Sequence, residues 1–134
     1  MKQAFSDHFK ETQAQVKRLD KVFKLIGRQP EGKECPALKG LVQETEELMS
    51  AAYGPEVMDA GLVGCAQAVE HYEIARYGTL IAWAEQLQLD DAIDLLEETL
   101  EEEEVTDERL TEIAMGGGLN ERADHPDDED DDDQ

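Results

Sequence analysis

Apolar residues recur every three or four positions along most of this chain, and no segment alternates between apolar and polar residues as a strand does. The pattern predicts an all-α protein with helices over about Lys2–Ile26, Pro36–Ala52, Glu56–Gln88 and Leu89–Gly116. Glycine and proline mark the predicted ends of these helices, at Gly27, Gly54-Pro55 and Gly116-Gly117-Gly118. Three long helices and one short helix are therefore expected.

The first predicted helix has two faces that could be buried. One is an apolar seam with alternating spacings of four and three residues, made of Phe5, Phe9, Thr12, Val16, Leu19, Phe23 and Ile26. The other is the neighbouring face, which holds Ala4, His8, Gln15, Val22 and Leu25. We expect the seam to pack against other helices.

Two of the predicted helices carry acids at positions where the pattern calls for apolar side chains. On the third helix, Glu70 and Glu73 interrupt a stripe that runs from Leu62 to Leu80. On the fourth helix, Glu103 and Asp107 interrupt the stripe that includes Leu96, Leu100 and Leu110. An unpaired buried carboxylate is costly, so such acids need a proton, a base or a cation. Acids at matching positions on two helices indicate a carboxylate metal site inside a helical bundle.

The first helix adds His8 and Glu11, which are three residues apart and so share a face. An oxygen-rich site with one or two imidazoles suits iron or manganese. His71, between the two glutamates, is a candidate nitrogen ligand or a packed histidine beside the site. A metal-free alternative remains, because Arg76 lies three residues after Glu73 and could neutralise it.

The third helix also carries a row of small residues that includes Gly61, Gly64 and Gly78. Glycine inside a helix costs about 0.8–1.0 kcal/mol relative to alanine. We therefore expect another helix to approach closely along this row.

The formal net charge of -22 excludes several classes of partner. Such a surface repels nucleic acid and anionic membranes, and it attracts divalent cations and basic partners. No apolar run approaches the length of a membrane span, and the first residues have no signal-peptide core. With only two cysteines, Cys35 and Cys65, the expected compartment is the reducing cytoplasm. Residues 1–116 form the predicted helical domain, and residues 117–134, which include the acidic run Asp127–Asp133, are predicted to be a disordered tail that could collect divalent cations.

Four segments resemble a known family: H-F-K-E-T-Q-A-Q-V-K-R-L-D (8–20), K-E-C-P-A-L-K-G-L (33–41), V-E-H-Y-E-I-A-R-Y-G-T-L (69–80) and E-T-L-E-E-E-E-V-T-D-E-R-L-T (98–111). They resemble the YciE/YciF-type ferritin-like proteins, a bacterial family linked to stress responses, and the resemblance covers residues 2 to 115. It implies a ferritin-like bundle in which residues 36–52 form a short connecting helix.

The resemblance also implies a set of ligands on this chain. Glu11 with His8, the pair Glu70 and Glu73, and Glu103 would be the bundle ligands, with Asp107 as a substitute ligand where ferritins have a histidine at the position of Thr106. The family pattern begins with a further helix that supplies another glutamate and precedes the first segment matched here. We therefore expect self-association, as a homodimer or a larger homo-oligomer, to complete the bundle.

Two functions of different classes follow from these patterns. The first is a stress-associated protein with a partial di-iron-type site, which handles iron or oxidant when assembled; whether it acts as an enzyme stays open. The second is a metal-free helical module for interaction or dimerisation, whose acids are held by Arg18, Arg76 and bound protons.

Overall fold

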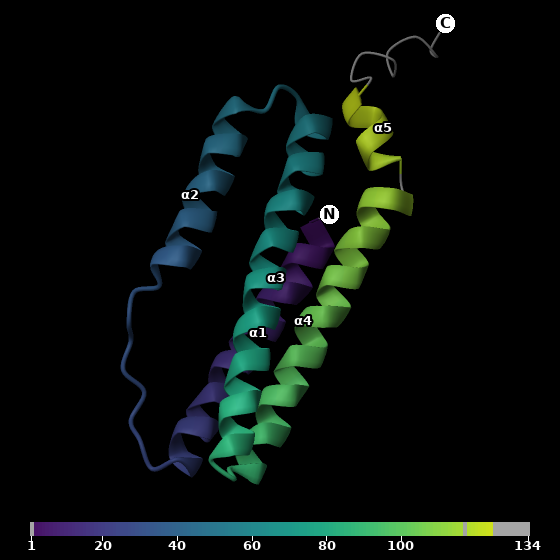
Figure 1. Ribbon diagram of the computed structural model, residues 1–134. Coiled ribbons are helices and arrows are strands. Elements are labelled where there is room, and N and C mark those ends of the chain that lie inside the picture. The colour runs from purple at the N-terminus through teal and green to yellow at the C-terminus, as the bar shows by residue number, and fades with distance from the viewer. Residues whose placement is uncertain (1, 117, 125–134) are drawn as a thin grey trace, which may run out of the picture. The chain divides into compact units, whose positions relative to one another are not determined.

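The computed structural model describes residues 2–116 and 118–124, and every regular element in that range is a helix. The helices are α1 (Lys2–Leu25), α2 (Pro36–Ala51), α3 (Pro55–Gln86), α4 (Asp90–Gly116) and α5 (Leu119–Asp124) (Figure 1). The all-α prediction is confirmed, and the four predicted helices are present with ends displaced by one or two residues.

The short helix α5 differs from the sequence prediction, which has no regular structure beyond residue 116. Its first residue, Leu119, is buried, and the strong helix formers Leu119, Arg122 and Ala123 also favour the helix. The acidic run Asp127–Asp133 lies outside the described residues.

Two helix ends are closed by residues in the left-handed region. Gly27 has φ of 66°, and the N–H of Arg28 reaches back to the carbonyl of Phe23, which closes α1 as the glycine predicts. At the end of α3, Gln88 has φ of 56° and closes the helix as Gly27 closes α1. The N–H of Leu89 donates to the carbonyl of Ala84. The short turn after α3 leads directly into α4.

The chain divides into two compact units, residues 1–34 with 70–106 and residues 35–69 with 107–134. In the first unit, α1 packs with the second part of α3 and the first part of α4. Tyr77 and Ala84 of α3 and Leu96 of α4 are buried at its centre. The partly buried side chains around them are Leu19, Val22, Ile81, Leu89, Ile93 and Leu100.

The predicted seam of α1 is confirmed only in part, because Leu19 packs against the core while Phe9 and Val16 face solvent within this chain. Phe9 and Val16 are 63 % and 56 % exposed, whereas Gln15 is only 5 % exposed. The inward face of α1 includes polar residues beside the apolar Val22, since Gln15 and Arg18 both make hydrogen bonds to glutamates of α4. These directed contacts decide which side of α1 is buried.

In the second unit, α2 packs on the first part of α3. A Cβ added at Gly61 would lie 2.6 Å from Cδ2 of Leu48, so the predicted close approach is confirmed there. A Cβ added at Gly64 or Gly78 would have nothing within 4 Å, so close helix packing does not explain the glycines at these two positions. A groove of about 300 Å³ follows the α2–α3 contact, lined by Leu41, Glu44, Leu48, Gly61, Gly64, Cys65 and Ala68. No helix within the described range is both long and apolar enough to span a membrane.

Candidate metal centre

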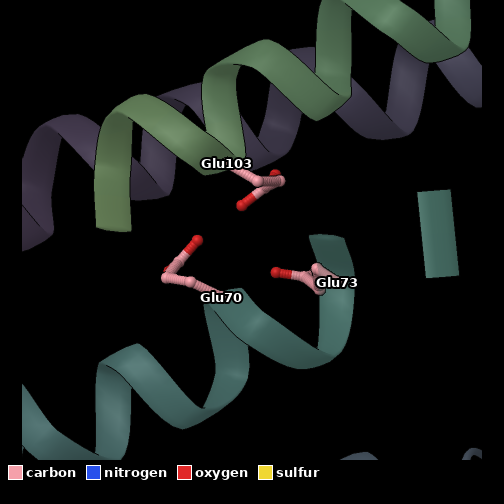
Figure 2. Close-up of side chains that lie close together, drawn as sticks. All are labelled: Glu70, Glu73 and Glu103. Atoms are coloured by element: carbon pink, nitrogen blue, oxygen red, sulfur yellow. The ribbon is translucent and has the colours of Figure 1, made fainter. Parts of the chain in front are cut away.

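Three glutamates of the first unit meet between α3 and α4. Glu70 and Glu73 project from α3 and Glu103 projects from α4, and one carboxylate oxygen of each lies within 4.8 Å of the other two (Figure 2). Residues three apart on a helix share a face, so Glu70 and Glu73 are directed to the same space. We call these three residues the glutamate cluster.

Two of the three glutamates are buried and Glu73 is half-buried, as the interrupted apolar stripes predict. Glu70 is 2 % exposed and Glu103 is fully buried, and Oε2 of Glu103 has no hydrogen-bond partner among the described residues. A buried polar atom without a partner is rare in a folded protein and calls for an explanation such as an ion. The carboxylate of Glu103 is therefore the strongest indication of a ligand.

The electrostatics of the cluster favour uptake of positive charge. Burial, and after it the nearby charge of Glu103, raises the pKa of Glu73 to about 7. No lysine or arginine of the described residues forms an ion pair with Glu73 or Glu103. Mutual repulsion of carboxylates in a poorly solvated site is relieved when a proton or a metal ion enters.

Tyr77 lies one turn after Glu73 on α3 and experiences the same surroundings. Burial is the main cause that raises the pKa of its phenol to about 12, and the charges of Glu73 and Glu103 add to this. Tyr77 is thus a neutral, packed aromatic residue at the end of the cluster.

The first helix contributes the two predicted residues His8 and Glu11 beside the cluster. Nε2 of His8 lies 3.4 Å from Oε1 of Glu70, and both groups belong to the first unit. Glu11 is half-buried and accepts a hydrogen bond of 3.5 Å from the hydroxyl of Thr106. The structure brings His8 to the cluster and places Glu11 against α4.

A polar network between α1 and α4 holds Glu103 in place. Nε2 of Gln15 donates to Oε1 of Glu103 and to Oε2 of Glu102. Arg18 donates from both terminal nitrogens to Glu102, and further to Glu98 and Thr99. The hydrogen bond and charge of Arg18 outweigh burial and hold the pKa of Glu102 below its usual range.

Sequence reasoning placed Gln15 on the second candidate face of α1 without giving it a role in the site. Its spacing from His8 and Glu11, seven and four residues, is the signal that could have identified it. Arg18 was expected to neutralise the buried acids, and it binds Glu98 and Glu102 instead of the cluster.

The remaining predicted residues lie elsewhere. His71 is exposed on α3 and does not belong to the cluster. Asp107 belongs to the second unit, where its Oδ1 lies 3.4 Å from Nε2 of Gln67. Arg76, the predicted counter-charge of Glu73, lies over the ring of Tyr72 with its guanidinium carbon 4.9 Å from the ring centre.

Chemically, the arrangement is a small set of oxygen donors with an imidazole nearby. Carboxylate oxygens on facing helices bind iron and manganese in bundle proteins, and His8 adds a nitrogen that suits the same metals. The buried, unpartnered oxygen of Glu103 fits such an ion.

Comparison with known proteins identifies the family. The model of a domain of unknown function, DUF892, matches residues 1–124. The protein YciF of Escherichia coli (strain K12) is 43% identical over 126 residues, which cover 93% of this chain and 75% of that protein.

Two solved structures have the same fold. The crystal structure of the E. coli stress protein YciF superposes with a TM-score of 0.83 and 43% identity, over 90% of this chain and 75% of that one. YcfI from Rhodopseudomonas palustris, whose description provisionally calls it a structural protein, superposes with a TM-score of 0.80 and 50% identity, over 81% of this chain and 69% of that one. Because the family model spans all of the described residues and a relative has this identity, the chain belongs to the DUF892 family of YciF-type proteins.

Proposed function

We propose that the glutamate cluster binds a transition-metal ion, iron or manganese, and that the protein handles iron or oxidant during stress. The observation that carries this proposal is the carboxylate of Glu103, which is fully buried, has one oxygen without a hydrogen-bond partner among the described residues, and faces two further glutamates. The description of the E. coli relative as a stress protein supports the physiological part.

The residues of this chain would have distinct roles in binding. Glu103 and Glu70 are the most deeply buried donors and would form the base of the site. Glu73, whose pKa is raised to about 7, would release its proton as the ion enters, so that affinity increases with pH. His8 lies against Glu70 on the α1 side and is the available nitrogen donor. Iron bound there would supply electron exchange with dioxygen or peroxide.

The test is iron retention by the full chain. The protein is loaded with Fe(II) without oxygen, loosely bound metal is removed by a weak chelator, and the retained iron is counted. Glu103→Gln removes a buried donor, whereas Glu104→Gln makes the same change at the exposed next position. We expect the first variant to lose iron that both wild type and Glu104→Gln retain.

Thermal unfolding gives an independent measurement on the same proteins. An ion that binds only the folded state raises the melting temperature. We expect iron to raise the melting temperature of wild type and Glu104→Gln, and to leave that of Glu103→Gln unchanged. Equal retention and equal thermal shifts in all three proteins would contradict the proposal and assign the bound iron to exposed acids.

A second candidate function is self-association through the uncovered apolar side chains of the first unit. Phe9 and Val16 on α1, Trp83 on α3 and Leu87 in the turn after α3 are each more than half exposed. Large apolar side chains in this number favour a homodimer or larger homo-oligomer. In sedimentation equilibrium, Trp83→Gln with Leu87→Gln would lower the mass to that of one chain. An unchanged mass would remove these two residues from the interface.

The expected setting of both functions is the cytoplasm, where iron is available as Fe(II) and where Cys35 and Cys65 would stay reduced. Acids outside the glutamate cluster would hold divalent cations weakly, and we expect the same of the acidic run Asp127–Asp133 in the sequence. The experiments above separate this weak binding from the buried site.

A further inference from the structure

The amide of Gln15 makes the two oxygens of Glu103 different from each other. Gln15 is 5 % exposed, and its Nε2 lies 2.5 Å from Oε1 of Glu103 and 3.1 Å from Oε2 of Glu102. A side-chain amide nitrogen carries two hydrogens, so these two acceptors use both. The opposite orientation of the amide would place its oxygen against two carboxylate oxygens, so the network determines the orientation.

The second acceptor of Gln15 is itself fixed. Arg18 contacts both oxygens of Glu102 at 2.8 Å and reaches Glu98 at 2.6 Å, a two-point contact that restricts how the Glu102 carboxylate can turn. Gln15 is therefore anchored at one hydrogen, and its other hydrogen is directed at Glu103.

The two oxygens of Glu103 consequently have different roles. Oε1 has a donor in Gln15, whereas Oε2 is buried and has no hydrogen-bond partner within the described range. An ion that binds Oε2 leaves the Gln15 contact intact. An ion that binds both oxygens has to share Oε1 with the amide, because Gln15 already occupies one of the two lone pairs of that oxygen.

We infer that Gln15 favours metal binding through the single oxygen Oε2 of Glu103 and thereby shifts the preference of the site towards a small transition-metal ion and away from Ca²⁺. This inference rests on the proposed metal site. Ca²⁺ takes six to eight oxygen ligands and commonly uses both oxygens of a carboxylate. Manganese and iron accept smaller mixed sets of oxygen and nitrogen donors. Gln15 is a positioning residue, since it acts on the metal only through Glu103.

The test compares two cations in two variants of the full chain. Gln15→Met removes both donors and keeps an unbranched side chain of similar length, while Gln13→Met makes the same chemical change at an exposed position of α1. Mn²⁺ binding is followed by the electron paramagnetic resonance signal of the free ion, and Ca²⁺ binding by competition with Mn²⁺. Excess Mg²⁺ occupies the exposed acids in all samples.

We expect Gln15→Met to weaken Mn²⁺ binding by about 10- to 100-fold, as is typical when the partner that orients a metal ligand is removed. Ca²⁺ binding should stay unchanged or strengthen, because no amide then competes for a lone pair of Oε1 of Glu103. The Mn²⁺/Ca²⁺ affinity ratio should therefore fall by at least about tenfold. Gln13→Met should leave both affinities within about twofold of wild type, as surface substitutions usually do.

Infrared spectroscopy of the Mn²⁺-loaded protein adds a readout of the ligand mode. The separation between the asymmetric and symmetric carboxylate stretches should narrow in Gln15→Met, because a carboxylate that binds through both oxygens has a smaller separation. Gln15→Asn keeps the amide with a shorter reach, and it should give an intermediate affinity ratio; it is the variant to measure if Gln15→Met loses its helical circular dichroism.

The outcomes separate this inference from the proposed function. If wild type retains no more Mn²⁺ than Glu103→Gln, the metal site is refuted and the inference with it. If wild type binds Mn²⁺ and the Mn²⁺/Ca²⁺ ratio is unchanged in the Gln15 variants, the site stands and Gln15 has no part in its selectivity. An equal loss of affinity for Mn²⁺ and Ca²⁺ would show that Gln15 only stabilises the fold, and this result would also overturn the inference.

Discussion

Replacing Glu73 by glutamine should stabilise the metal-free protein at neutral and higher pH. Burial and the charge of Glu103 raise the pKa of Glu73 in the folded state to about 7, from an ordinary value of 4.5. Between these two values the unfolded chain has released a proton that the folded protein still holds. The stability of the folded state therefore falls as the pH rises through this window, and the loss is complete above the folded pKa.

The size of the effect follows from the shift. At about 1.4 kcal/mol per pKa unit, ionised Glu73 lowers the free energy of unfolding by about 3 kcal/mol at pH values above the window. Near the lower end of the window the cost is below about 1 kcal/mol, because the unfolded carboxyl is still partly protonated. Glutamine has nearly the same shape and cannot ionise, so Glu73→Gln removes this cost.

The assay is urea unfolding followed by circular dichroism, with a chelator present, at several pH values from about 5 to about 8. At each pH, the free energy of unfolding of wild type is subtracted from that of Glu73→Gln, which removes the contributions of the other acids. Glu85→Gln, at an exposed position of the same helix, is the control. The difference should grow with pH for Glu73→Gln and stay flat for Glu85→Gln. A difference that does not depend on pH would show that Glu73 ionises normally in the folded protein and would refute the reasoning from burial.

Three further predictions concern the packing of the helices. Gly61→Ala should destabilise the protein by about 1 kcal/mol, because crowding against Leu48 outweighs the gain in helix propensity. Gly64 has open space around it, so Gly64→Ala should stabilise the protein by up to about 1 kcal/mol in the same urea assay. Arg18→Met should lower the free energy of unfolding by about 1–3 kcal/mol, because it leaves half-buried Glu102 without its charged partner. A change near zero would show that this ion pair contributes no more than an exposed one. Gln88→Gly should stabilise by about 1 kcal/mol, since glycine adopts the positive φ of this turn without strain, and an unchanged urea midpoint would contradict this.

Much of the fold and part of the site could be predicted because they depend on local periodicity. The spacing of apolar residues predicted four helices, and Gly27 predicted the closure of α1. The spacing of Glu70 and Glu73 within an apolar stripe predicted that both would face the interior, and the position of Glu103 in its own stripe predicted the same. These are properties of residues within one helix, so no knowledge of distant contacts is required.

The orientation of α1 and the membership of the site were decided by the tertiary structure. By sequence pattern, the seam with Phe9 and Val16 and the neighbouring face with Gln15 were both candidates for burial. Helix α1 turns Gln15 and Arg18 inward, because glutamates of α4 offer these side chains charged acceptors. Those acceptors are more than 80 residues away along the chain, so helical periodicity contains no information about them.

The sequence by itself determined which residues share a helical face, including the two glutamates of α3 that form most of the cluster. Only the tertiary structure decided that Gln15 contacts Glu103, that Arg18 binds Glu102 instead of the cluster, and that Arg76 lies over an aromatic ring. The physical reason is that periodicity is a property of one helix, whereas hydrogen bonds and ion pairs between helices depend on which faces meet.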